Sequence, residues 1–162
     1  MFNIQKNNFL ISFALMNTLL AVDLGVKTGY AQYSEEGKIM RYQSHNFGNA
    51  QRLKRGVYGI LKSCENLQFL YLEGGGKLEK YWIKEAQKLG IIVIQLHAHD
   101  WRNEIYPAIK HSDKTKQAKV FAEKKALEIL QRQGAPTPSS LTHDVAEAII
   151  IGYYGCKQQG WI

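Results

Sequence analysis

Short runs of mainly apolar residues mark three candidate strands in this sequence, at residues 19–22, 68–72 and 91–94. Runs of this length and character are typical of strands that are buried on both faces of a sheet. Residues 30–34 and 38–44 form two further strand-like segments, and the Glu-Glu-Gly tripeptide between them predicts a hairpin turn. Five strands are therefore expected, and the first three form an antiparallel meander.

Elsewhere the apolar residues recur at three- and four-residue spacing, which is typical of one face of a helix. This spacing predicts helices over residues 50–66, 78–89, 113–132 and 142–154. Residues 101–109 contain a proline and show no clear period. The order of the elements predicts an α/β domain with a mixed five-stranded sheet, in which two parallel strands follow the meander and helices cover both faces.

The length of 162 residues is that of one domain with a substantial core. A short apolar stretch behind Lys6 looks like the core of a signal peptide, but no small-residue cleavage site follows it. The stretch is also too short to span a bilayer. Because Met16 is an alternative start, we expect residues 1–15 to be a disordered or non-native extension, and residues 16–162 to be the single domain.

Lysine and arginine number 21 against 14 acidic residues, which gives a net charge of +7. A basic balance favours polyanionic partners such as nucleic acid over a membrane. Cys64 and Cys156 match neither a metal-binding spacing nor a disulfide framework. We therefore expect a reducing compartment: the cytoplasm, in association with the nucleoid, or an organellar matrix if the host is a eukaryote.

Two of the apolar runs end in acids, Asp23 and Glu73. If their strands are parallel neighbours, both carboxylates lie at the carboxyl edge of the sheet, where ligand sites form in α/β proteins. The last predicted helix adds Asp144 and Glu147, three residues apart and so on one face. Gathered carboxylates repel one another, and Mg²⁺ or Mn²⁺ relieves the repulsion. Two such ions about 3.5–4 Å apart activate a water and stabilise the leaving oxygen of a phosphodiester.

Each acid also has a simpler interpretation. Asp23 can accept hydrogen bonds from the turn after its strand, and Glu73 can pair with a lysine. Asp144 can cap its helix, and Glu147 can be a surface acid. The occurrence of all four on suitable elements of one basic chain favours the metal site.

Over about residues 17–155 the chain resembles the RuvC-type Holliday-junction resolvases of the RNase H-like superfamily. Residues 20–31, with their aspartate and two glycines, resemble the family's first strand and its leading metal-binding acid. Residues 70–73 resemble the strand that ends in the second metal-binding acid. Residues 144–149 resemble the closing acid-x-x-acid-Ala-aliphatic helix. The resemblance implies an RNase H-like fold and metal-binding roles for Asp23, Glu73, Asp144 and Glu147.

The resemblance also implies a lysine that assists phosphate binding, at the start of the preceding helix. Lys116 is the first choice, with Lys114 and Lys119 as alternatives. Glu147 stands where the family usually has aspartate, so we expect it to reach a metal ion through a water or from a shifted helix. His143 is then a ligand, a proton-transfer group or a surface residue at the end of the helix.

The implied activity belongs to a homodimer that binds four-way DNA junctions, intermediates of recombination and repair. Two Mg²⁺ ions per active site, for which Mn²⁺ substitutes, support symmetric cleavage that leaves 5′-phosphates. Asp23 is expected to bridge the ions. The basic residues expected to contact DNA phosphates are Arg52, Lys54, Arg55, Lys77, Lys80, Lys84, Lys114 and Lys119. Tyr81 or Trp82 is expected either to stack on bases at the junction core or to be buried.

Other functions compete with this interpretation. Related nucleases that process structured RNA, such as ribosomal RNA precursors, share the first-strand pattern but usually lack a glutamate after the fourth strand. A junction-binding protein without cleavage is a second alternative, because Glu147 departs from the family pattern. Sugar-kinase and actin-like ATPases share an Asp-x-Gly loop but need two copies of the fold. His97 and His99 resemble a metal-binding pair, although alternate residues at a strand end need not converge on one ion.

Overall fold

The computed structural model describes residues 16–105 and 116–162 of the chain. The extension predicted over residues 1–15 and the alternative lysine Lys114 lie outside the described residues. Within them, none of the helices has both the length and the apolar character that a membrane crossing requires.

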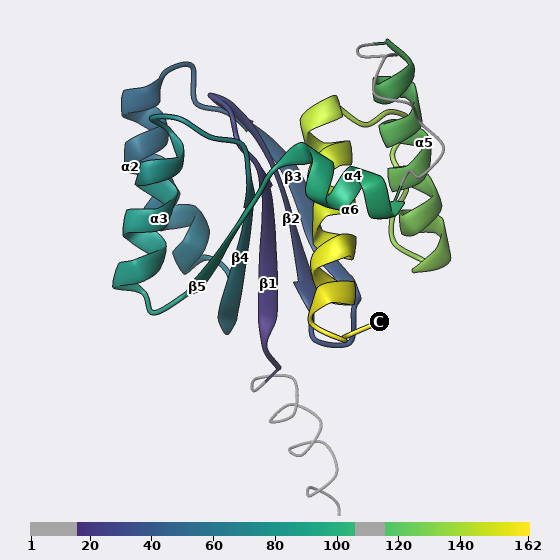
Figure 1. Cartoon of the computed structure of the whole chain (residues 1–162), viewed down its shortest axis with the longest axis horizontal. Coiled ribbons are helices and arrows are strands. Elements are labelled where there is room, and N and C mark those ends of the chain that lie inside the picture. The colour runs from purple at the N-terminus through teal and green to yellow at the C-terminus, as the bar shows by residue number, and fades with distance from the viewer. Residues whose placement is uncertain (1–15, 106–115) are drawn as a thin grey trace, which may run out of the picture.

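A mixed five-stranded sheet forms the centre of the molecule (Figure 1). Its strands are β1 (Thr18–Asp23), β2 (Lys27–Ser34), β3 (Ile39–Asn46), β4 (Leu67–Glu73) and β5 (Ile92–Leu96). They lie in the order β3-β2-β1-β4-β5. The β1–β2 and β2–β3 pairs are antiparallel, whereas β4 is parallel to both β1 and β5. The predicted meander followed by two parallel strands is therefore confirmed.

Helices cover both faces of the sheet, as predicted (Figure 1). The described helices are α2 (Ala50–Lys62), α3 (Glu79–Lys88), α4 (Ala98–Ile105), α5 (Lys116–Arg132) and α6 (His143–Gln158). Alternate residues of β1 face opposite sides of the sheet. Leu20 and Val22 pack into the core under α2 and α3, while Leu19 and Ala21 pack into the core under α6 and α5.

The last helix, α6, lies between the sheet and α5 and is buried over most of its length. A helix that is apolar on nearly all sides is stable only when other elements surround it. The Tyr33 hydroxyl of β2 donates a 2.7 Å hydrogen bond to the Ile149 carbonyl, and a side chain at Gly152 would overlap the Tyr33 ring. These contacts set the position of α6 on the sheet.

A glycine in β2 allows the amino end of α6 to approach the sheet closely. Gly29 lies within β2, opposite Asp23 of β1. A Cβ atom at this position would overlap the backbone carbonyl of Asp144. The absence of a side chain at Gly29 therefore places the first turn of α6 beside the end of β1.

Two local predictions were wrong. Residues 91–94 do not form a strand buried on both faces, because β5 is an edge strand and the Ile92 side chain is 52% exposed. The helix predicted over residues 50–66 ends at Lys62, since the chain turns before β4 and Asn66 has a φ of 49°. Its other end is regular: the Asn49 side chain accepts a 3.0 Å hydrogen bond from the Arg52 backbone N–H.

Candidate metal centre

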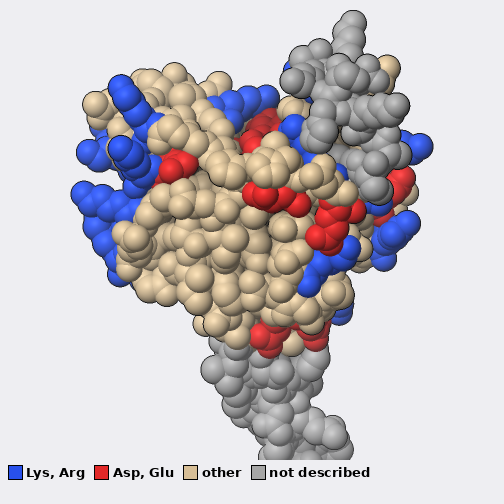
Figure 2. Space-filling view, in the orientation of Figure 1, with Lys and Arg blue, Asp and Glu red and all other residues tan. Residues whose placement is uncertain are grey.

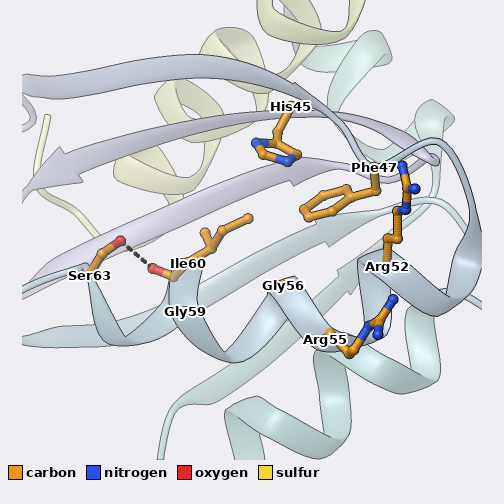
Figure 3. A pocket seen from close by; sticks show the side chains of 8 residues that line it. All are labelled: His45, Phe47, Arg52, Arg55, Gly56, Gly59, Ile60 and Ser63. Carbon is orange, nitrogen blue, oxygen red and sulfur yellow. Dashed lines mark hydrogen bonds between the residues drawn. The ribbon is translucent and has the colours of Figure 1, made fainter.

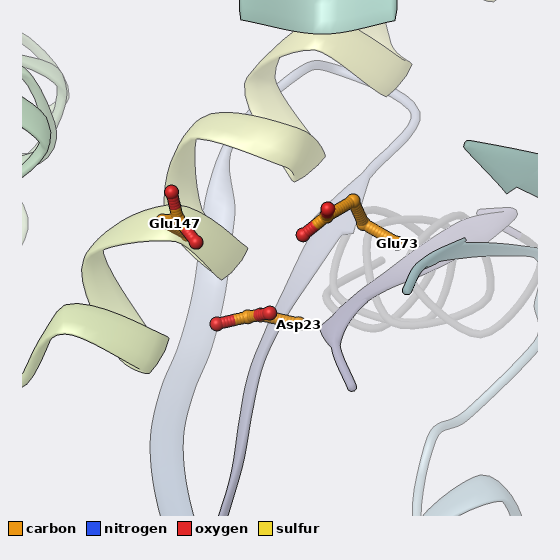
Figure 4. Close-up of side chains that lie close together, drawn as sticks. All are labelled: Asp23, Glu73 and Glu147. Carbon is orange, nitrogen blue, oxygen red and sulfur yellow. The ribbon is translucent and has the colours of Figure 1, made fainter. Parts of the chain in front are cut away.

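Two carboxylates meet at the carboxyl edge of the sheet because β1 and β4 are parallel neighbours. Asp23 is the register partner of Glu73. The pairing continues one residue further, where the Leu24 backbone N–H donates a 2.9 Å hydrogen bond to the Glu73 carbonyl. Helix α6 brings Glu147 to the same place, and the three side chains point toward one another (Figure 4). One carboxylate oxygen from each residue lies within 4.8 Å of the others.

Burial and mutual repulsion make this cluster unfavourable when all three acids are ionised. Burial raises the pKa of Asp23 to about 8, with further contributions from the charges of Glu147, Glu73 and Asp144. Burial and the Glu147 charge also raise the pKa of Glu73, although the Arg102 charge opposes them. Among the described residues, no lysine or arginine forms an ion pair with Asp23 or Glu73.

The donor set fits a divalent cation. Three oxygen donors from β1, β4 and α6 surround one point, and two of them have no cationic partner of their own among the described residues. Hard cations such as Mg²⁺ and Mn²⁺ prefer carboxylate oxygens. Asp23, Glu73 and Glu147 are therefore the residues best placed to hold such an ion.

Glu147 differs from the other two acids because it has an arginine partner. Arg102 Nη2 of α4 lies 2.6 Å from Glu147 Oε1, and the Glu147 side chain is 8% exposed. The Arg102 guanidinium also lies 5.1 Å from the ring centroid of Trp101. Sequence reasoning missed Arg102, because residues 101–109 showed no period and the contact joins residues 45 positions apart.

Asp144 lies beside the cluster and is not one of the three gathered acids. The Ser44 hydroxyl donates a 2.5 Å hydrogen bond to its carboxylate, and Lys27 Nζ lies 3.6 Å away. Burial alone raises the pKa of Asp144, but hydrogen bonds from Ser44 and Thr142 and the charge of Lys27 outweigh it and lower the pKa overall. From the sequence, we expected Asp144 to bind a metal ion directly and Glu147 to reach it through a water or from a shifted helix. The structure places Glu147 with Asp23 and Glu73 in the carboxylate cluster.

The remaining predicted catalytic residues lie near the same end of the sheet or on α5. His143 Nε2 is 3.5 Å from Glu147 Oε2, and its buried Nδ1 has no hydrogen-bond partner among the described residues. Lys116 is the first residue of α5, and Lys119 is exposed on that helix. Their roles remain predictions. His97 and His99 stack with ring centroids 5.6 Å apart and join no ligand cluster within the described part of the chain.

Most of the basic residues predicted to contact DNA are exposed on or next to α2 and α3. Figure 2 shows lysine and arginine side chains gathered over these helices, at the left of the view. The exposed residues are Arg52, Lys54, Arg55, Lys77, Lys80 and Lys84. Tyr81 is partly buried, with Lys54 Nζ 5.7 Å from its ring centroid. Trp82 is fully buried, so the core alternative is confirmed for this residue.

Arg52 and Arg55 also border a hollow of about 520 Å³ between β3 and α2 (Figure 3). Its wall includes His45 and Phe47, whose ring centroids lie 4.2 Å apart. Phe47 belongs to the core under α2, on the opposite face of the sheet from α6. The hollow is therefore separate from the carboxylate cluster.

Comparison with known proteins finds similar solved structures but no matching family model or curated sequence. Thermus thermophilus RuvC in complex with a Holliday junction substrate has a TM-score of 0.60 and 12% identity, covering 89% of this chain and 96% of that one. A second Thermus thermophilus RuvC structure has a TM-score of 0.55 and 14% identity, covering 86% and 96%.

The yeast mitochondrial Holliday junction resolvase Ydc2 has a TM-score of 0.57 and 13% identity, covering 88% of this chain and 80% of its own. The similarity thus extends over most of the chain in each case. At these identities the comparisons establish the fold and not the chemistry. The chain has the RNase H-like fold of RuvC and Ydc2, as the sequence resemblance implied.

Proposed function

We propose that this protein is a RuvC-like, metal-dependent endonuclease that resolves four-way DNA junctions. The observation that supports the proposal is the meeting of Asp23, Glu73 and Glu147 at the carboxyl edge of the sheet. This cluster lies in a fold shared with RuvC and Ydc2. The net charge of +7 and the exposed basic residues of α2 and α3 favour a polyanionic substrate.

In this proposal Asp23, Glu73 and Glu147 hold two divalent ions, with Asp144 and His143 as additional ligands or neighbours. Bound Mg²⁺ or Mn²⁺ supplies charge for the scissile phosphate and activation of the attacking water. His143, whose Nε2 lies 3.5 Å from Glu147 Oε2, is the proton-transfer group beside the centre. Lys116 assists in holding the phosphate.

The basic residues on and next to α2 and α3 bind the DNA arms through their phosphates. Such contacts release counterions, so binding weakens steeply with salt. Two symmetric cuts in one junction require two active sites, and we therefore include a homodimer in the proposal.

The decisive experiment compares three substrates: a synthetic mobile four-way junction, a linear duplex of the same sequence and a structured RNA. Each is incubated with the protein in Mg²⁺, in Mn²⁺ and in EDTA. We expect paired nicks with 5′-phosphates in the junction alone, and only with metal. Asp23→Asn should abolish cleavage while junction binding is retained. Glu36→Gln, which removes one charge at an exposed residue paired with Lys38, is the matched control.

The other outcomes separate the alternatives. Cleavage of the RNA alone would identify an RNA-processing nuclease and contradict the DNA substrate. Tight junction binding without cleavage in either metal would identify a binding protein and contradict the enzyme.

A further inference from the structure

We propose that Arg102 is an exchangeable counter-ion of Glu147. Its guanidinium neutralises the Glu147 carboxylate when no metal ion is bound, and it leaves that carboxylate when the centre is loaded. The inference rests on the metal centre proposed above, and it assigns a positioning role to a residue of α4 that lies outside the carboxylate cluster.

The contact between the two residues has the geometry of a strong, charge-assisted hydrogen bond. Arg102 Nη2 and Glu147 Oε1 are 2.6 Å apart, at the short end of the usual range for such pairs. Glu147 is buried, and burial of an unpaired carboxylate is strongly unfavourable. In the metal-free fold Arg102 therefore provides the positive charge that Glu147 needs.

The same contact occupies an oxygen of a residue in the ligand cluster. Glu147 Oε1 is held by Arg102, and Glu147 Oε2 lies 3.5 Å from His143 Nε2. Both oxygens thus face nitrogen atoms of the protein. A cation that coordinates Glu147 meets the guanidinium at short range, and two cations that share one carboxylate repel each other. Metal binding and the Arg102 contact consequently oppose each other.

Arg102 is also placed so that it can leave. Its side chain is 40% exposed, whereas that of Glu147 is 8% exposed. The guanidinium already lies near the face of Trp101, with 5.1 Å between its central carbon and the ring centroid. A guanidinium released from a carboxylate pairs well with phosphate, because its planar donors match both groups. Displacement therefore frees a phosphate-binding side chain next to the centre.

Metal binding and thermal unfolding, both measured without DNA, test this inference. We compare the wild type with Arg102→Gln and Arg102→Met, and use Arg132→Gln as the control for loss of one exposed arginine. Mn²⁺ binding is followed by the loss of its free-ion electron paramagnetic resonance signal. For Arg102→Gln we expect a lower Tm in EDTA and a larger rise in Tm when Mn²⁺ is added. We also expect Mn²⁺ to bind about five- to tenfold more tightly, because couplings of this size are usual between ligands that compete. Arg132→Gln should match the wild type.

The opposite sign would overturn the inference. A residue that merely orients a metal ligand supports metal binding, and its loss weakens affinity about 10–100-fold. Equal or weaker Mn²⁺ binding by Arg102→Gln is thus incompatible with exchange. If this variant does not fold, Arg102→Met, which keeps an unbranched stem without the charge, decides: tighter binding than the wild type supports exchange, and equal or weaker binding contradicts it. If the wild type and Asp23→Asn bind Mn²⁺ alike, the proposed metal centre itself is wrong and the inference fails with it.

Discussion

Asp23 and Glu73 are register partners in the parallel pairing of β1 and β4. The sheet therefore forces two acids together at one edge, and α6 adds Glu147 to the pair. Stability alone does not favour such an arrangement, because buried like charges repel. The cluster therefore lowers the stability of the metal-free protein, and this effect can be measured without a nuclease assay.

Replacing Asp23 by asparagine should stabilise the metal-free protein. The substitution removes the carboxylate whose pKa burial and its neighbours raise to about 8. We expect a gain of about 1–2 kcal/mol at pH 8, since replacing poorly compensated buried charges is often stabilising. Thermal unfolding in EDTA measures this gain. The same variant should lack the rise in Tm that we expect Mn²⁺ to give the wild type. A decrease in its metal-free stability would contradict the prediction.

The stability of the metal-free wild type should increase as the pH falls from about 8 toward 4. The pKa of Asp23 is about 8 in the folded state and 3.8 in its ordinary state, so the folded state binds the proton more tightly throughout this window. The raised pKa of Glu73 acts in the same direction. Tm measured in EDTA across this range tests the trend, and the Asp23→Asn variant should show a shallower dependence.

Divalent ions should bind more tightly at pH 8 than at pH 6. Below about pH 8 Asp23 carries a proton in the metal-free protein, and the ion must displace it. Loss of one proton on binding gives a change of about tenfold in apparent affinity per pH unit. Calorimetric titration with Mn²⁺ in buffers of different ionisation enthalpy measures both the affinity and the proton release. A pH-independent affinity would show that Asp23 is not a ligand.

Glu147→Gln should weaken metal binding more than Asp144→Asn does. Glu147 is one of the three gathered acids, whereas Ser44 and Lys27 engage the Asp144 carboxylate. We expect a loss of about tenfold or more for Glu147→Gln, at least the size of the losses seen for residues that only support a ligand. Both variants remove one charge from the first two turns of α6, so each is the control for the other. A larger loss for Asp144→Asn would restore the ligand set expected from the sequence.

Gly29→Ala should destabilise the fold and impair the metal centre together. The added Cβ would overlap the Asp144 carbonyl, so α6 must move away from the sheet. Overpacking of this kind costs about 1–3 kcal/mol. Gly59→Ala in α2 is the matched control, because no atom outside the adjacent backbone of its own helix lies within 4 Å of its Cβ position. We expect the control to be neutral or slightly stabilising, as alanine is preferred over glycine inside a helix. Unfolding and Mn²⁺ titrations check both variants.

Much of the fold could be predicted because its determinants are local. The apolar run before Asp23, the Glu-Glu-Gly turn and the periodic helices each depend on neighbouring residues, and their order predicts the sheet. The edge position of β5 could not be predicted, because a short apolar run has the same pattern in a central strand as in an edge strand that one helix covers. Ile92, 52% exposed, is the residue that shows the difference.

The candidate site was predictable only in part, because some of its residues are brought together by the packing of helices and not by local sequence patterns. Acids at strand ends identified Asp23 and Glu73, and the spacing on α6 identified Asp144 and Glu147 as a pair. Which of the last two enters the cluster depends on how deeply α6 sits on β2, and Gly29 sets that depth. Arg102 depends on the placement of α4 beside α6, which no local pattern in the sequence specifies.

The three acids come from β1, β4 and α6, and α6 is the last helix among the described residues. A ribosome-bound chain therefore contains Asp23 and Glu73 but not Glu147 while residues 74–146 are added. Because α6 follows the other described elements in the sequence, the centre is completed only when the last helix docks on an otherwise finished sheet. Under the proposed function, an enzyme that cuts DNA thus completes its metal centre only after the described strands and the helices before α6 have been synthesised.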